Sequence, residues 1–149
     1  MKRTWKNAIT LLLTLALLTA VLAIPAAAVD SRSSLYLSGY RAWLTPESGG
    51  KICVTIDVQA VDDMDYVGAT KVVMYESSDG GNTWSNVRTY LSALEEGMLW
   101  EDDVIYFYTP ITHQGTPGYK YCAVVTVYAE DSTGYDSREY QTPTVIAIP

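Results

Sequence analysis

The fold is decided by one stretch of the chain, Lys51-Ile52-Cys53-Val54-Thr55-Ile56-Asp57-Val58-Gln59, in which one alternate set of residues is strictly apolar. Successive side chains of a β-strand point to opposite faces of the sheet, so this period of two indicates a strand that is buried on one face. The buried face is predicted to consist of Ile52, Val54, Ile56 and Val58, with the polar side chains and Cys53 on the opposite face.

Six other segments have strand-like patterns. In residues 119–127, one face carries Tyr121, Ala123, Val125 and Val127, and the other carries Lys120, Cys122, Val124 and Thr126. The remaining segments are 34–44, 69–77, 84–91, 104–111 and 140–148. Residues typical of turns occupy 46–50, 79–82 and 115–118, so seven strands are predicted.

Helical patterns are scarce. Only Ser92 to Met98 has the composition of a helical turn, which Gly97 closes. Many short strands without a long helix predict an all-β, antiparallel sandwich or barrel. Pro143 cannot donate a backbone hydrogen bond, so it is expected at an edge or a bulge of the last strand.

Two parts of the chain resemble a known fold family. The run Val72-Val73-Met74-Tyr75-Glu76-Ser77-Ser78-Asp79-Gly80-Gly81-Asn82-Thr83-Trp84-Ser85-Asn86-Val87 is similar to the hairpin of the third and fourth strands in fibronectin type III-like domains. Thr116-Pro117-Gly118-Tyr119-Lys120-Tyr121 resembles the start of their sixth strand. The resemblance implies a seven-stranded antiparallel immunoglobulin-like sandwich, in which Tyr121 points inward and returns its hydroxyl to the backbone.

The chain also resembles a family of small secreted single-domain proteins of Gram-positive bacteria, whose function is uncharacterised. Sandwiches of this type carry many unrelated functions, so the resemblance implies a fold and not an activity.

The N-terminus has the organisation of a secretory signal peptide. Lys2, Arg3 and Lys6 precede an apolar run over 8–24, and alanines occupy 26–28. We predict a signal peptide over 1–28, a single β-sandwich domain over 29–149, and secretion without membrane attachment. The alternative is an uncleaved anchor, since the apolar run reaches the lower limit of about 17 residues for a bilayer span. Pro25 and the alanines favour cleavage.

The charge of the chain bears on its partners. The sequence has 10 Lys and Arg against 17 Asp and Glu. Three of the cations lie before Ala28, whereas every anion lies at Asp30 or beyond. The predicted mature chain therefore has seven cations against 17 anions, which is a formal charge of −10. Nucleic-acid binding needs Lys and Arg gathered on one surface, so the sequence argues against nucleic acid as a partner.

Residues suited to catalysis are few. His113 is the only histidine, and it is expected as a solvated loop residue because a lone histidine makes neither a zinc site nor a catalytic triad. No Gly-x-Ser-x-Gly, His-Glu-x-x-His or phosphate-loop motif is present. We therefore predict a protein that is not an enzyme and uses no cofactor. A glycan hydrolase with a carboxylate pair stays as a third alternative, because that geometry leaves no sequence spacing.

Two acidic clusters, Asp62, Asp63 and Asp65, and residues 101–103, raise the question of calcium. Oxygen-rich loops bind calcium when several carboxylates and carbonyls converge. Neither cluster has the spacing of an EF-hand loop, so both are predicted to be solvated turns. Asp62, Asp63 and Asp65 stay as weak calcium candidates, and no metal site is assigned.

The composition favours recognition. The chain has 12 Tyr against one Phe, and tyrosine combines apolar area with a hydroxyl that tolerates water. The leading prediction is a secreted, non-catalytic binding module with a protein or cell-surface partner. The alternative is a carbohydrate-binding module, with sugar rings stacked on Trp84, Trp100 or nearby tyrosines.

The fibronectin type III-like alignment makes the third and sixth strands neighbours, with Val72 and Met74 pointing inward. An exposed patch of Val73, Tyr75, Val124 and Tyr128 is then predicted on the other face. These four residues, together with Trp84 as a stacking residue, are the candidate binding residues. A purely structural explanation also exists, because strands favour such residues through cross-strand packing alone.

Two cysteines in a secreted chain predict, by number alone, one disulfide. The alternation instead places Cys53 and Cys122 on the faces opposite the core residues. If their strands lie in different sheets, the two sheets are about 10 Å apart, whereas a disulfide needs the two Cα atoms within about 7 Å. Both cysteines are therefore predicted to point outward and to stay unpaired.

Overall fold

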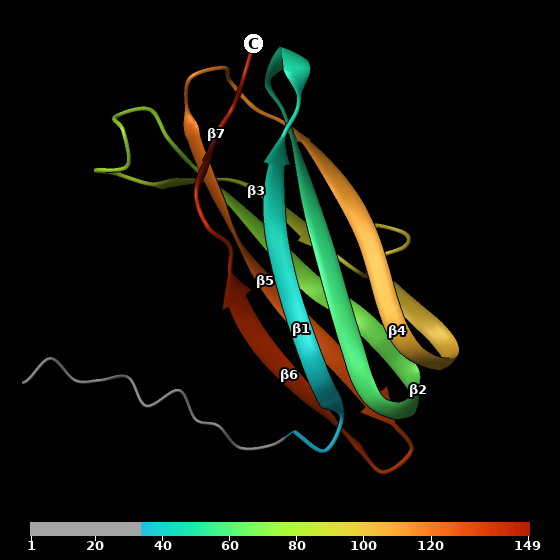
Figure 1. Cartoon of the computed structure of the whole chain (residues 1–149). Coiled ribbons are helices and arrows are strands. Elements are labelled where there is room, and N and C mark those ends of the chain that lie inside the picture. Colours follow the sequence, from blue (N-terminus) through green and yellow to red (C-terminus); the bar gives the residue numbers. More distant parts are fainter. Residues whose placement is uncertain (1–33) are drawn as a thin grey trace, which may run out of the picture. The chain divides into compact units, whose positions relative to one another are not determined.

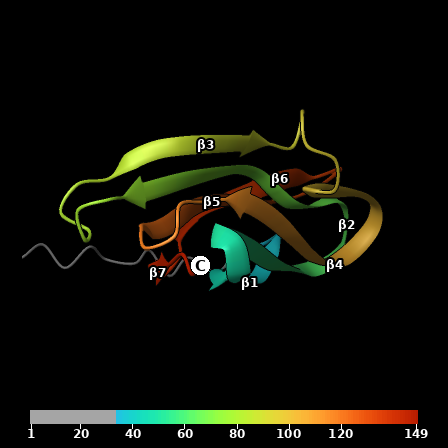
Figure 2. The ribbon, with the colours of Figure 1, turned by 90° about the horizontal axis from the view of Figure 1, so that it is seen from above.

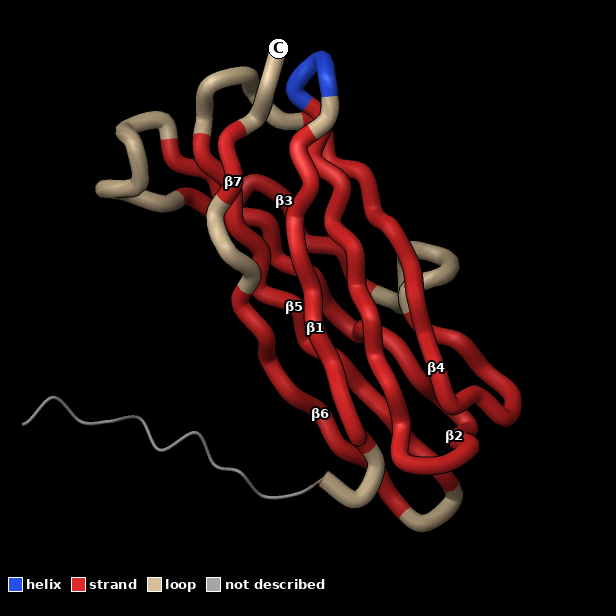
Figure 3. Tube along the Cα trace, in the orientation of Figure 1, coloured by secondary structure: helices blue, strands red, loops and turns tan. Residues whose placement is uncertain are grey.

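The structure of the protein, a computed structural model, describes residues 34–149 (Figure 1). The predicted signal peptide, 1–28, lies outside the described residues. The elements are β1 (Leu37–Pro46), the short helix η1 (Ser48–Gly50), β2 (Lys51–Ser77), β3 (Ser85–Leu91), β4 (Leu99–Gln114), β5 (Lys120–Asp131), β6 (Gly134–Gln141) and β7 (Val145–Ile146). All strand pairs are antiparallel, which confirms the predicted all-β antiparallel fold. Within 34–149, η1 is the only helix, at the β1–β2 connection (Figure 3).

Strand β2 is shared by two layers. Its first part, residues 51–60, pairs with β1 and β4. Its second part, residues 66–77, pairs with β3 and β5, and residues 66–68 also pair with the start of β4. Strands β6 and β7 pair with β5. Seen from the end, β3, β5 and β6 lie in one layer, and β1 and β4 lie in the other (Figure 2). We call these the β3–β6 layer and the β1–β4 layer.

The inner faces of the two layers form the hydrophobic core. The first part of β2 contributes Ile52, Val54, Ile56 and Val58, all 0% exposed, which confirms the predicted alternation. The β3–β6 layer contributes Val72, Met74, Tyr121, Ala123, Val125 and Val127, which are equally buried. Full burial of one large aliphatic side chain contributes about 1.5–3 kcal/mol to folding, so these two alternating rows drive the layers together.

The strand boundaries differ from the prediction at two places. The second and third predicted strands are parts of one continuous strand of 27 residues, β2. The predicted last strand, 140–148, is wrong: residues 134–141 form β6, and Pro143 lies between β6 and the two-residue β7.

Strand β6 escaped prediction because its sequence lacks an apolar alternation. Asp136 and Arg138 stand opposite Ala129 and Val127 of β5, on the face that elsewhere is apolar. These two charged side chains pair with each other, with Arg138 Nη1 2.6 Å from Asp136 Oδ1. The ion pair permits polar residues at core-side positions of an edge strand.

Candidate functional site

The predicted interaction residues lie on the outer face of the β3–β6 layer. Val73 and Val124 are direct cross-strand partners, and Tyr75 stands opposite Cys122, so β2 and β5 are neighbours as the alignment predicted. A register shift between Ala69 and Lys71 inserts one extra residue into β2. This bulge changes the phase of the alternation: before it Val67 and Ala69 are buried, and after it Val72 and Met74 are buried, which leaves Val73 and Tyr75 on the outer face.

Three of the five candidate residues meet in a hollow on this face. Tyr75, Trp84 and Val124 line it together with Cys122, Gln141 and Thr144, and its volume is about 390 Å³. Trp84 is 38% exposed, whereas Tyr75 and Val124 are half-buried. None of these six side chains is charged, so the hollow suits an apolar group that is flanked by a few hydrogen-bonding partners. We call it the Trp84 hollow.

The other two candidate residues are placed differently from the expectation. Val73 was expected to be exposed but is only 9% exposed, between Thr89 of β3 and Val124 of β5. Tyr128 stands opposite Gly68, further along β5, and does not line the Trp84 hollow.

Tyr128 belongs to a separate cluster of aromatic and acidic groups. Its ring stacks on that of Tyr135, with centroids 5.6 Å apart, and its hydroxyl donates to Glu130 Oε2 at 2.5 Å. Burial, followed by the hydrogen bond to Glu130, raises the pKa of Tyr128 to about 12. This phenol therefore stays protonated and is already engaged with its own strand.

A rigid turn holds Trp84 at the edge of its hollow. Gly80 and Gly81 have φ angles of 78° and 100°, which favour glycine. Asp79 Oδ1 accepts hydrogen bonds from the backbone N–H groups of Thr83 at 2.9 Å and Asn82 at 3.0 Å. The hydrogen bonds from Thr83, followed by that from the Ser77 hydroxyl, hold the pKa of Asp79 well below its usual range. The turn keeps its geometry at neutral pH, and Trp84 follows it directly.

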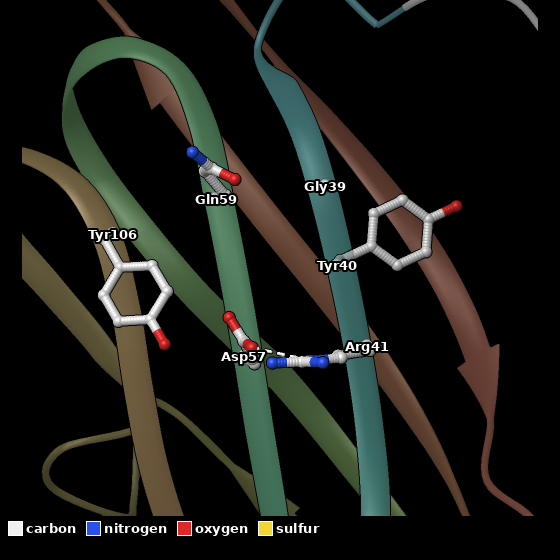
Figure 4. A pocket seen from close by; sticks show the side chains of 6 residues that line it. All are labelled: Gly39, Tyr40, Arg41, Asp57, Gln59 and Tyr106. Carbon is white, nitrogen blue, oxygen red and sulfur yellow. Dashed lines mark hydrogen bonds and ion pairs between the residues drawn. The ribbon is translucent and has the colours of Figure 1, made fainter.

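A second hollow lies on the outer face of the β1–β4 layer (Figure 4). Its volume is about 400 Å³, and its lining consists of Gly39, Tyr40, Arg41, Asp57, Gln59 and Tyr106. Arg41 Nε donates to Asp57 Oδ2 at 2.7 Å across the β1–β2 pair. We call this the Arg41 hollow.

Sequence reasoning missed the Arg41 hollow. The alternation assigns Asp57 and Gln59 to the face opposite the core, which is correct, although Asp57 is only 9% exposed. The pattern does not reveal the neighbours of either residue. Arg41 stands opposite Asp57, and Gln59 stands opposite Tyr106, only in the register that the structure has. The one available signal was the presence of opposite charges on two strands that a short turn connects.

His113 was expected in a solvated loop, and this prediction is wrong. The residue lies in β4 and is half-buried, with its Nδ1 3.1 Å from the hydroxyl of Tyr90. The ring of Tyr121 lies on its other side, with centroids 5.9 Å apart. Burial, opposed in part by the negative charge of Glu76, lowers the pKa of His113 below its ordinary value. The imidazole is thus held between two phenol rings in its neutral form.

The calcium candidates are exposed and do not converge. Asp62, Asp63 and Asp65 lie between the two parts of β2, with a hydrogen bond from the N–H of Asp63 to Asp62 Oδ1. Among the residues that the structure describes, no three His, Cys, Asp or Glu side chains gather closely enough to hold a metal ion. The side chains of the second cluster, 101–103, lie outside the described part of the chain.

The two cysteines lie on different layers, and neither is bonded to another sulfur in the described structure. Cys53 stands between Thr45 of β1 and Thr112 of β4 and is half-buried. Cys122 belongs to the outer face of its sheet, as predicted, but it is only 5% exposed because it lies at the base of the Trp84 hollow. Burial raises the pKa of its thiol.

Trp100, the other tryptophan considered for sugar stacking, is 51% exposed and lines neither hollow. Its ring meets the buried Phe107 edge-on, with centroids 6.2 Å apart. No helix within residues 34–149 has the length and apolar character needed to cross a membrane. Comparison with protein-family models and with curated proteins gives no match for this chain.

Proposed function

We propose that the protein is a secreted, non-catalytic binding module that recognises a protein partner through the Trp84 hollow. In this proposal it is a fibronectin type III-like sandwich and belongs to the family of small secreted Gram-positive proteins that it resembles. Two observations support the classification. The second part of β2 pairs with β3 and with β5, as the resemblance implies for the third strand with the fourth and the sixth, and Tyr121 is fully buried beneath the 115–118 turn.

The observation that carries the function is the meeting of Tyr75, Trp84 and Val124 in one uncharged hollow. The sequence predicts Tyr75 and Val124 in an outward-facing apolar patch, and Trp84 as a separate candidate for stacking on a ligand. Aromatic side chains with a polar tip are frequent at protein interfaces, because they offer a large contact area and still tolerate water in the free state. An apolar side chain of a partner would be received between the rings of Tyr75 and Trp84.

Strand β3 supports a protein as the occupant. In the described residues β3 pairs with β2 alone, and 85–89 are all exposed. An edge strand offers unpaired backbone N–H and C=O groups, to which an extended segment of a partner can add as a further strand. Trp84 immediately precedes β3, so such a segment would run beside the hollow.

The environment of His113 supports the non-catalytic part of the proposal. A general base needs a hydrogen bond to a nucleophile and a group that orients it. The hydrogen-bond partner of the His113 imidazole is the phenol of Tyr90, which burial keeps protonated by raising its pKa. The contact between Tyr90 and His113 links β3 to β4.

The proposal is tested with secreted protein recovered from culture medium together with its binding partners. Trp84→Ala should reduce recovery of the partner at least tenfold, a loss of about 1.4 kcal/mol or more. Trp100→Ala, which removes an equally large exposed ring elsewhere, should leave recovery unchanged. Equal recovery with both variants would contradict the assignment of the hollow. An N-terminus that begins after Ala28 in the medium would test secretion separately.

A further inference from the structure

The Arg41 hollow gathers hydrogen-bonding groups of both kinds on three neighbouring strands (Figure 4). The carboxylate of Asp57 only accepts, and the guanidinium of Arg41 only donates. The amide of Gln59 and the hydroxyl of Tyr106 do both. A ligand that presents several hydroxyl groups would find a partner for each donor and each acceptor.

The internal contacts of the hollow leave most of this capacity unused. Arg41 binds Asp57 through Nε alone, and its terminal nitrogens make no hydrogen bond within residues 34–149. The Arg41 side chain is 69% exposed, whereas that of Asp57 is 12% exposed. The pair therefore fixes the guanidinium in place while its outer edge stays accessible.

Tyr106 and Gln59 complete the polar rim. Within residues 34–149 the Gln59 side chain makes no hydrogen bond, and the Tyr106 hydroxyl lies close enough to the Asp57 carboxylate to interact with it. Partial desolvation, followed by the nearby Asp57 carboxylate, raises the pKa of Tyr106, so its hydroxyl keeps its proton for donation.

Aromatic rings flank the polar groups on the same face. Tyr108 stands opposite Asp57 on β4, and the Arg41 guanidinium carbon lies 5.2 Å from the ring centroid of Trp43. The rings of Trp43 and Tyr108 are themselves 6.4 Å apart. Pyranose sugars match this surface, because their C–H faces are apolar and pack on the negative face of an aromatic ring while their hydroxyl edges are polar.

The charge of the hollow narrows the ligand class. Asp57 and Arg41 cancel each other, and the chain as a whole is acidic, with a sequence pI of about 4.5. A phosphorylated or uronic-acid ligand gains little here, because Asp57 neutralises the charge of Arg41 and the acidic chain disfavours the approach of an anion. A neutral ligand meets no such barrier.

The space in the hollow is itself a feature of the sequence. Gly39 follows a register shift between Leu37 and Gly39 in β1, and its φ angle is outside the left-handed region. A Cβ atom there would meet only Gln59 Oε1, at 3.9 Å. The ion pair between Arg41 and Asp57 does not by itself require the free space beside Gly39. From these features together we infer that the Arg41 hollow is a binding site for a neutral oligosaccharide, on the face opposite the proposed protein site.

The test is affinity electrophoresis of the mature protein in native gels that contain soluble neutral polysaccharides: a glucan, a mannan, a galactan, a xylan and an arabinan in turn. At least one should slow migration of the wild-type protein. Tyr106→Ala should weaken that retardation about tenfold or more, as expected for the loss of a hydroxyl and a ring contact together. Gly39→Val, which fills the hollow but keeps every polar group, should do the same.

The controls separate this site from the Trp84 hollow and from misfolding. Trp84→Ala should be retarded like the wild type, and both hollow variants should keep the wild-type melting temperature. If Tyr106→Ala does not fold, Gly39→Val and Tyr106→Phe carry the test. No retardation by any neutral polysaccharide, equal retardation of wild type and Gly39→Val, or stronger retardation by polygalacturonate would each overturn the inference.

Discussion

The hydroxyl of Tyr121 accepts a hydrogen bond from the backbone N–H of Thr116 at 2.8 Å and donates its own proton to Glu76 Oε2 at 2.9 Å. The side chain is 0% exposed. A Cβ atom at Gly115 would lie 2.8 Å from Tyr121 Cζ, so only glycine lets the turn approach the ring this closely. One phenol thus ties the turn before β5 to both β5 and β2.

This relationship predicts a stability change. Tyr121→Phe removes the hydroxyl, leaves the N–H of Thr116 without its partner and strips one hydrogen bond from Glu76. We expect a loss of about 1–3 kcal/mol in the free energy of unfolding, measured by urea denaturation. Tyr135→Phe, at a residue that is 65% exposed, is the matched control and should have little effect. Equal stability of Tyr121→Phe and the wild type would contradict the role of this hydroxyl.

His113 should make stability depend on pH. Burial lowers its pKa below the ordinary value of 6.5, so the unfolded chain binds a proton in a pH range where the folded chain does not. Stability should therefore be complete above about pH 6.5 and decrease as the pH falls from there toward the folded pKa. Thermal melts between pH 8 and pH 5 would measure this, since the chain has one histidine.

The matched variant for this prediction is His113→Gln, which keeps a hydrogen-bonding group near Tyr90 but cannot titrate. Its stability should vary less with pH across the same range. A wild-type curve that is flat below pH 6.5, or one that rises on acidification, would rule out the buried neutral imidazole.

The cysteines should remain reduced in the secreted protein. Cys53 and Cys122 lie on different layers, so the intact mass should equal that of the dithiol form. In the native state iodoacetamide should label Cys53 faster than Cys122, because Cys122 is 5% exposed and its thiol pKa is raised by burial. In urea both should react. A peptide that links Cys53 to Cys122 would require a different arrangement of the two layers.

Calcium should not change stability. Asp62, Asp63 and Asp65 are exposed. In the described residues they do not gather into a group of three possible ligands that could hold a metal ion. Addition of millimolar calcium, followed by a chelator, should leave the melting temperature unchanged. A reversible rise with calcium would return these carboxylates to the list of candidate ligands.

The sequence was sufficient to predict the elements whose two faces differ in chemistry. Ile52 to Val58 and Tyr121 to Val127 alternate because one face is buried, and both strands form as expected. Strand β6 was missed because Asp136 and Arg138 replace apolar residues at its core side, and their ion pair is visible only in three dimensions.

The same distinction applies to the candidate sites. Tyr75 and Val124 were accessible to sequence reasoning, because two alternating strands place them on one face, whereas only the structure brings Trp84 beside them. The bulge between Ala69 and Lys71, which changes the buried positions from Val67 and Ala69 to Val72 and Met74, is not predicted by the sequence pattern. The Arg41 hollow depends on the register of three strands, which no local pattern encodes.

The central claim, that a protein partner engages the Trp84 hollow and the edge strand β3, is tested most directly by hydrogen exchange of the protein with and without its recovered partner. The account predicts slower exchange of backbone amides in β3 and of residues around Tyr75 in the complex, with the outer face of β1 and β4 unchanged. Protection confined to β1 and β4, with β3 exchanging as in the free protein, would contradict it.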